Sequence, residues 1–190
     1  MMTKFYKLIR VISIPPIVVS IMILILRINN YLTNLEALLL FIFLGLIQLI
    51  AYPISYLIPF FKKQGREGQR TLAFYIGIIG YSIGLIYAIC AELPFKLEII
   101  YFTYFNSIII LTFINKVLKV RASGHLTSIT GPLVGLTYFM GPLLIIPSAI
   151  FYLLVFVSSL KLKRHTVKEM ILGTLVVLVS FGLANLIMLI

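Results

Sequence analysis

Residues 125–165 read HLTSITGPLVGLTYFMGPLLIIPSAIFYLLVFVSSLKLKRH, with a histidine at each end of an apolar stretch. Gly-Pro is a strong turn signal, and a residue that precedes proline is disfavoured in a helix. Gly141-Pro142 therefore predicts two short helices, 125–140 and 142–158, joined by a tight turn. One membrane span would put the two histidines on opposite sides, whereas a hairpin returns the chain. We therefore expect His125 and His165 on the same side.

The composition of the chain predicts an all-α membrane protein. Of the 190 residues, 62% are hydrophobic and only 11% are charged, and the mean hydropathy is +1.15, well outside the range of soluble domains. A helix needs about 20 apolar residues to cross the hydrocarbon core of a bilayer. We expect one integral membrane domain over 1–190, a polytopic bundle of six to seven transmembrane helices. The predicted spans are 11–28, 35–60, 72–91, 97–117, 125–140, 142–158 and 168–190.

The formal net charge of +11 belongs to loops at the membrane surface. Nucleic-acid binding needs a solvated domain with a basic face, and the sequence contains no polar domain. On the seven-span arrangement 14 of the 16 Lys and Arg lie on the histidine side, and only Arg27 and Lys96 on the other. Lys4, Lys7 and Arg10 agree with this bias without belonging to any motif. By the positive-inside rule we expect a multi-pass protein of the cell membrane with this basic face in the cytoplasm.

The residues that can carry chemistry fall in three loops, which the seven-span arrangement brings to one face. In chain order these loops contain Lys63-x6-Arg70, Ser123-Gly124-His125 and His165-x3-Glu169. Histidine suits proton transfer or nucleophilic attack near neutral pH. Clustered cations suit an anionic, phosphate-like substrate. The three loops therefore predict phosphoryl chemistry.

The order of these motifs resembles the type 2 phosphatidic acid phosphatase family of integral membrane lipid phosphatases. That family has Lys-x6-Arg-Pro, Pro-Ser-Gly-His and Ser-Arg-x5-His-x3-Asp motifs. The resemblance covers roughly 62–173, which is more than half of the chain. It implies a helical core like that of the family and a metal-independent phosphatase without a cofactor. The implied substrate is a lipid phosphate or diphosphate, either glycerolipid or polyprenyl, and the oligomeric state stays open.

The resemblance also implies a role for each motif residue. His165 would attack phosphorus to give a phosphohistidine, and His125 would protonate the leaving alkoxide and then help to activate water. Glu169, one helical turn after His165, would fix the tautomer of its imidazole. The phosphoryl oxygens would be held by Lys63, Arg70, Ser123 and the backbone N–H of Gly124.

The chain departs from the family pattern most seriously at Ser159, six residues before His165, where the family has a phosphate-binding arginine. The other departures leave the groups that would contact phosphate unchanged: Thr71 and Ala122 replace prolines, and Glu169 replaces an aspartate and keeps its charge. Losing one preorganised donor costs on the order of 10²- to 10³-fold in rate. The candidates to compensate are Arg121, Lys161, Lys163 and Arg164, although lysine does not match arginine in bidentate phosphate binding.

Ser159 leaves a second interpretation open. In it, a protein with the fold of this family has lost catalysis and either binds lipid phosphate or serves as a membrane assembly subunit. Glu169 also fits a simpler role, because an acidic side chain stabilises the first turn of a helix. Taken singly, Lys161, Lys163 and Lys168 can also be explained as loop cations that set the orientation of the protein in the membrane. A transporter is less favoured, since the polar residues cluster in loops rather than at the bilayer midplane.

Overall fold

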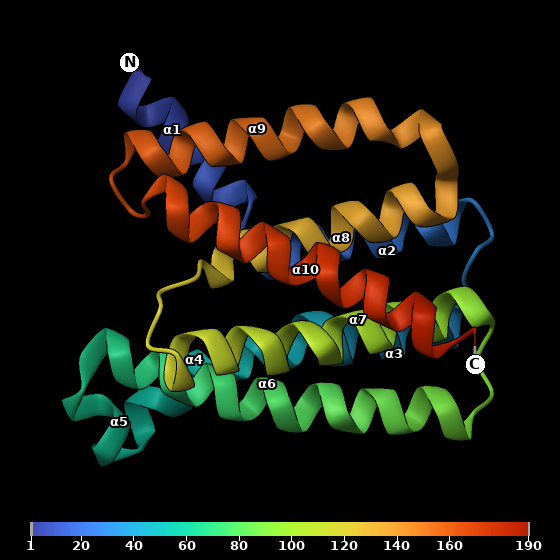
Figure 1. Cartoon of the computed structure of the whole chain (residues 1–190), viewed down its shortest axis with the longest axis horizontal. Helices are drawn as coiled ribbons and strands as arrows, with labels where there is room; N and C mark the ends of the chain where they lie inside the picture. Colours follow the sequence, from blue (N-terminus) through green and yellow to red (C-terminus); the bar gives the residue numbers. More distant parts are fainter. Residues whose placement is uncertain (1, 190) are drawn as a thin grey trace.

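The computed structural model describes residues 2–189, and every regular element in that range is helical (Figure 1). The predicted all-α class is confirmed. The elements are α1 Met2–Ile12, α2 Pro15–Ile28, α3 Asn34–Leu40, the π-helix η1 Phe41–Leu46, α4 Ile47–Leu57, α5 Pro59–Lys63, α6 Gly65–Cys90, α7 Phe95–Thr112, the π-helix η2 Phe113–Val117, α8 Gly124–Met140, the 3-10 helix η3 Gly141–Leu144, α9 Ile145–Lys161 and α10 Val167–Ile187.

Several of these helices are long and apolar enough to cross a membrane, as a helical membrane bundle requires. Five segments qualify, or six when a bent pair near the N-terminus is counted as one span. The predicted number was six to seven. The difference arises at Gly124–Lys161, a 38-residue segment that counts once although it contains two helices of 17 residues each. Each of these helices is about 26 Å long, slightly short of a hydrocarbon core of about 30 Å.

The chain reverses between α8 and α9, which lie side by side in Figure 1. Gly141 adopts a φ of 73° at the turn, a conformation that glycine reaches without steric cost. Two hydrogen bonds join the start of α8 to the start of α10. Ser123 N donates to Glu169 O over 2.9 Å, and Thr127 Oγ1 donates to Gly173 O over 2.9 Å. A straight 38-residue helix, about 57 Å long, could not make these contacts.

The chain also bends near the N-terminus, where the sequence predicts one span over 11–28. The structure has two helices there, and they are bent by 58°. Ile14 is extended because it precedes Pro15, and Pro16 has no N–H to continue the helix from Ile12. The bend lets α1 pack against α9, so α1 lies next to the loop that contains His165.

The core of the bundle forms around α7, which packs against α6 on one side and α10 on the other. Leu97, Ile99, Ile100 and Tyr101 of α7 are each no more than 1% exposed. The outward faces of the helices carry many exposed Leu, Ile and Phe side chains. Such an apolar surface suits contact with lipid rather than with water.

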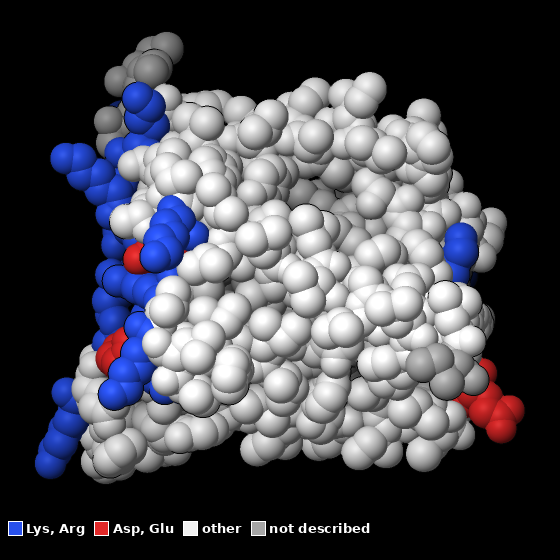
Figure 2. Space-filling model, in the orientation of Figure 1, with Lys and Arg blue, Asp and Glu red and all other residues white. Residues whose placement is uncertain are grey.

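Lysine and arginine gather at one end of the bundle, and an uncharged belt separates this end from the other (Figure 2). Residues 4–10, 59–70, 116–125 and 161–169 lie at this end, which we call the basic end. They contain 14 of the 16 Lys and Arg, together with Glu67 and Glu169. The remaining charged residues are Arg27, Lys96, Glu36, Glu92 and Glu98. The two ends therefore differ strongly in charge, as the seven-span arrangement predicts.

Candidate active site

His165 lies at the basic end, in the loop between α9 and α10, and is oriented by Glu169. Its Nδ1 is 2.9 Å from Glu169 Oε2. A carboxylate only accepts, so Nδ1 carries the proton and donates it to Glu169. The lone pair of the neutral ring is then on Nε2. This is the tautomer that a histidine nucleophile needs.

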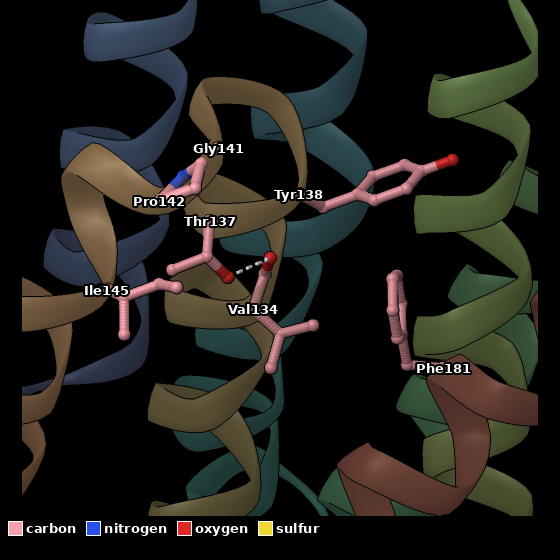
Figure 3. A pocket seen from close by; sticks show the side chains of 7 residues that line it. All are labelled: Val134, Thr137, Tyr138, Gly141, Pro142, Ile145 and Phe181. Atoms are coloured by element: carbon pink, nitrogen blue, oxygen red, sulfur yellow. Dashed lines mark hydrogen bonds between the residues drawn. The ribbon is translucent and has the colours of Figure 1, made fainter.

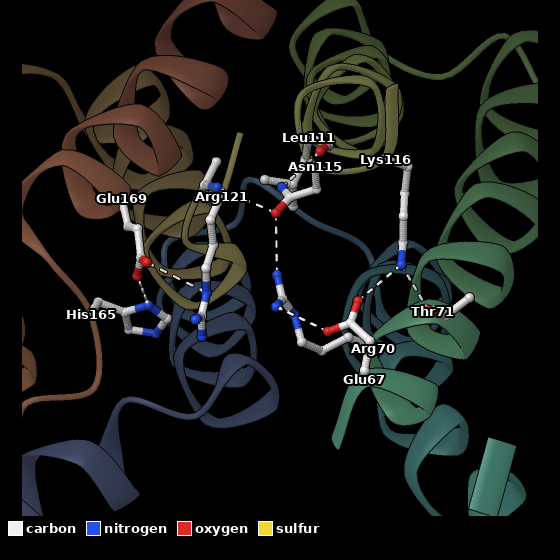
Figure 4. Close-up of polar contacts among 10 residues, drawn as sticks. Glu67, Arg70, Thr71, Leu111, Asn115, Lys116, Arg121, His165 and Glu169 are labelled. Atoms are coloured by element: carbon white, nitrogen blue, oxygen red, sulfur yellow. Dashed lines mark hydrogen bonds and ion pairs between the residues drawn. The ribbon is translucent and has the colours of Figure 1, made fainter. Parts of the chain in front are cut away.

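Glu169 is itself held by a capping box and by an ion pair. Thr166 Oγ1 accepts from Glu169 N over 3.3 Å, while Glu169 Oε2 accepts from Thr166 N over 3.4 Å, and together they form a capping box at the start of α10. Its other carboxylate oxygen, Oε1, is 3.5 Å from Arg121 Nε (Figure 4). The carboxylate therefore caps the helix and contacts His165 at the same time, and its orientation is fixed.

The protonation of His165 depends on opposing effects. Burial lowers its pKa below the ordinary value and is the largest effect; the hydrogen bond and the charge of Glu169 raise it, and the cations Arg121 and Arg10 lower it again. The net pKa is lowered. The imidazole is therefore neutral near pH 7, with Nε2 free to act as a nucleophile.

His125 lies in the first turn of α8. Its Nε2 is 3.3 Å from the hydroxyl of Ser13, at the break between α1 and α2. That hydroxyl donates to Arg10 O over 3.2 Å, so its oxygen accepts from Nε2–H. Arg10 and His165 are both near enough to His125 for a positive charge on either to act on it. The two histidines of the chain are therefore electrostatic neighbours at the basic end.

Ser123 and Gly124 fix the start of α8. Ser123 is fully buried, and its hydroxyl caps α8 by accepting from Leu126 N. Its role here is structural, because its backbone N–H also bonds to Glu169 O. Gly124 is the first residue of the helix, where a backbone N–H has no partner within the helix and can bind an anion.

Arg70 belongs to a second cluster, next to the histidines. It donates to Asn115 Oδ1 over 3.2 Å and pairs with Glu67 over 3.5 Å, and Glu67 also pairs with Lys116 over 3.1 Å. This cluster surrounds a cavity of about 140 Å³, whose lining includes Arg121. Because Arg121 also pairs with Glu169, it joins this cavity to the histidine site, as Figure 4 shows.

Lys63, Ser159 and most of the candidate compensating cations contribute no side-chain contact to this site. Lys63 is exposed at the end of α5, without a hydrogen bond or ion pair in the part of the chain described. Ser159 is buried on α9 with 2% exposure. Lys161, Lys163 and Arg164 are exposed, and among residues 2–189 none of them pairs with a carboxylate. Of the four candidates to replace the missing arginine, only Arg121 contacts a site residue.

Five residues of these clusters were not predicted as site residues, and Glu67 of α6 is one of them. Asn115 and Lys116 both belong to η2, Arg10 belongs to the last turn of α1, and Ser13 lies at the break between α1 and α2. The signal for the latter pair was Pro15-Pro16, which bends a helix and here brings Ser13 to His125.

Fold and site together define a helical membrane protein with a polar, histidine-containing site at one end of the bundle. Comparison with known proteins gave no match: no protein-family model, no curated protein and no solved structure is significantly similar to this chain. The resemblance to the type 2 phosphatidic acid phosphatases therefore rests on the three motifs alone.

Proposed function

We propose that this protein is a membrane phosphatase that hydrolyses a lipid phosphate or diphosphate through a phosphohistidine. The observation that carries the proposal is the contact of 2.9 Å between His165 Nδ1 and Glu169. It prepares Nε2 for attack at the basic end of the bundle, where His125 is near enough to interact electrostatically with His165. We further infer, from the positive-inside rule, that the basic end faces the cytoplasm.

In the proposed first step, Nε2 of His165 attacks phosphorus and the bond between phosphorus and the lipid oxygen breaks. His125 acts as the imidazolium, with a proton on each ring nitrogen: it leaves the Ser13 hydroxyl, gives its Nε2 proton to the departing alkoxide and is left as the neutral ring. In the second step His125 takes a proton from water, the resulting hydroxide attacks phosphorus, and the N–P bond breaks to release phosphate. Arg121 and the N–H of Gly124 stabilise the charge on the phosphoryl oxygens.

A lipid substrate is favoured by an apolar cavity further along α8. A second cavity of about 300 Å³ opens between α8, η3, α9 and α10, lined by apolar side chains such as Val134, Ile145 and Phe181 (Figure 3). It begins 9 residues after His125, about 14 Å further along α8. An acyl or prenyl chain whose phosphate lies at His165 would reach it.

Phosphate release tests the proposal directly. The protein purified in detergent should release phosphate from at least one member of a panel of glycerolipid and polyprenyl mono- and diphosphates. Turnover on the order of 1 s⁻¹ or more is expected of an evolved substrate. If the protein releases no phosphate from any member, the catalytic proposal is wrong.

The second candidate is a protein that binds lipid phosphate without hydrolysing it. The observation that favours it is Ser159, a small buried side chain where the family has an arginine. Saturable binding of a lipid phosphate, with no phosphate released over hours, would select this candidate.

The pH dependence of activity should shift in opposite directions in two variants. Protonated His165 cannot attack, so activity falls as the pH drops through the pKa of His165. Glu169→Gln removes the groups that raise this pKa and should move the acid limb of the kcat/KM profile to lower pH, whereas Arg121→Ala removes a cation that lowers it and should move the limb to higher pH. Shifts in the same direction for both variants would contradict the assignment of His165.

A further inference from the structure

Arg10 on α1 has a buried donor without a partner. The side chain is partly buried, and among residues 4–189, whose side chains the structure describes, no group accepts a hydrogen bond from Nη1, which is shielded from solvent. Leaving a buried donor unpaired costs about 1–3 kcal/mol, and more for a charged group. Such a group calls for an explanation, and an anion is a common one.

The surroundings of Arg10 are cationic. Arg66 and Arg164 are near enough to act on its charge, and Arg10 in turn acts on His125 and His165. In the part of the chain described, no carboxylate lies within ion-pair distance of Arg10. Like charges gathered in a partly buried space repel one another, and an anion bound among them would attract each of them and so offset this repulsion.

The backbone ties Arg10 to the histidine site. The Ser13 hydroxyl donates to Arg10 O over 3.2 Å and lies 3.3 Å from His125 Nε2. The helix that carries Arg10 packs against α9, the helix that carries Ser159. Helix α1 therefore brings a guanidinium to the part of the bundle where Ser159 has replaced the expected arginine. The planar fork of a guanidinium matches two phosphate oxygens.

We propose that Arg10 binds the phosphoryl group of the substrate and takes over the role of the arginine that Ser159 replaces. This inference rests on the proposed function and deepens it. Helix α1 is then a wall of the active site, and its bend at Ser13 is what positions it. The ligand class is a tetrahedral oxyanion such as phosphate.

Arg10→Ala is the direct test, with Lys7→Ala as its matched control, because Lys7 is an exposed cation on the same helix. Two quantities are measured in detergent: kcat/KM for release of phosphate from a lipid phosphate, and the affinity for orthovanadate, a phosphate analogue. Arg10→Ala should lower kcat/KM about 10²- to 10³-fold and weaken orthovanadate binding by more than tenfold, while Arg10→Lys should recover only part of each. Lys7→Ala should leave both within twofold.

The melting temperature without oxyanion separates a binding role from a structural one. Because Nη1 has no partner among the side chains described (residues 4–189), Arg10→Ala should leave the Tm unchanged or raise it. With orthovanadate, the wild-type protein should gain Tm and Arg10→Ala should not. A fall in Tm without oxyanion, with unaltered stabilisation by orthovanadate, would overturn the inference.

Moving the arginine back provides a gain-of-function test. Ser159→Arg in the Arg10→Ser background should restore at least tenfold in kcat/KM, whereas Ser159→Arg alone should give no gain, since two guanidinium groups would then compete for one oxyanion. The opposite result would be that Arg10→Ser changes kcat/KM little and that Ser159→Arg alone raises it strongly. This result would show that no other cation has replaced the arginine, and it would contradict the inference. If the double variant does not fold, the orthovanadate affinities of Arg10→Ala and Arg10→Lys decide.

The outcomes separate this inference from the proposed function. An active wild-type protein whose activity and orthovanadate affinity do not depend on Arg10 overturns the inference and leaves the phosphatase standing. A wild-type protein that releases no phosphate but binds orthovanadate through Arg10 supports the inference and selects the binding protein. A wild-type protein that neither releases phosphate nor binds orthovanadate overturns both.

Discussion

Replacing His165 with alanine is expected to abolish phosphate release, with kcat lowered at least about 10³-fold. The substitution removes the nitrogen that attacks phosphorus, and no other histidine has Glu169 as a partner. Steady-state release of phosphate from the best substrate of the panel measures the effect. Lys168→Ala is the matched control, since Lys168 is an exposed cation in the first turn of α10 and should leave kcat within twofold.

The fold should tolerate the loss of His165, so the result can be attributed to chemistry. Glu169 keeps its capping box with Thr166 and its ion pair with Arg121 in the variant. The Tm in detergent is therefore expected to change by no more than a few degrees. A His165→Ala protein that folds and retains more than a tenth of wild-type kcat would show that another residue is the nucleophile.

Gly173→Ala is expected to reduce both stability and activity, because it pushes α8 away from α10. A Cβ at Gly173 would overlap the backbone oxygen of Ser123, which cannot move without shifting α8. Overpacking of this kind costs about 1–3 kcal/mol. The bonds that Glu169 O and Gly173 O accept from α8 would also be strained. A displacement of about 1 Å between catalytic groups is enough to lower kcat about 10²-fold.

Gly182→Ala is the matched control for Gly173→Ala. It lies on the same helix, and an added Cβ would meet nothing within 4 Å. Alanine favours a helix over glycine by about 1 kcal/mol, so the Tm should stay the same or rise and the activity should stay unchanged. Equal Tm and kcat in the two variants would contradict the close contact between α8 and α10.

Features set by local chemistry were the ones that could be predicted from the sequence. The apolar composition indicates the all-helical bundle, and Gly141-Pro142 is a turn signal whose two residues alone suffice. The contact between His165 and Glu169 was expected from their four-residue spacing, although His165 lies in the loop before α10 and reaches Glu169 from outside the helix. These features involve only neighbours along the chain.

Features that depend on packing could not be predicted in the same way. The order of the motifs predicts that Arg70 lies at the basic end. Its contact with Asn115, however, joins residues 45 apart in the chain, and no rule of sequence spacing predicts such a contact. From the sequence, Arg10 was interpreted as a residue that orients the first span, because a continuous helix over 11–28 places it at the membrane surface and away from the site. The 58° bend changes where this side chain lies. Pro15-Pro16 indicates a bend without indicating its direction.

The most direct test of the proposed chemistry is to trap the phosphoryl-enzyme. The protein is mixed with a lipid phosphate labelled with ³²P in its phosphoryl group, quenched within milliseconds in alkali, and mapped by mass spectrometry. A phosphohistidine survives alkali and is lost in acid. The expected result is acid-labile label on the peptide that contains His165, with none in His165→Ala. Phosphate release without label on His165, or label on another residue, would contradict the proposed mechanism.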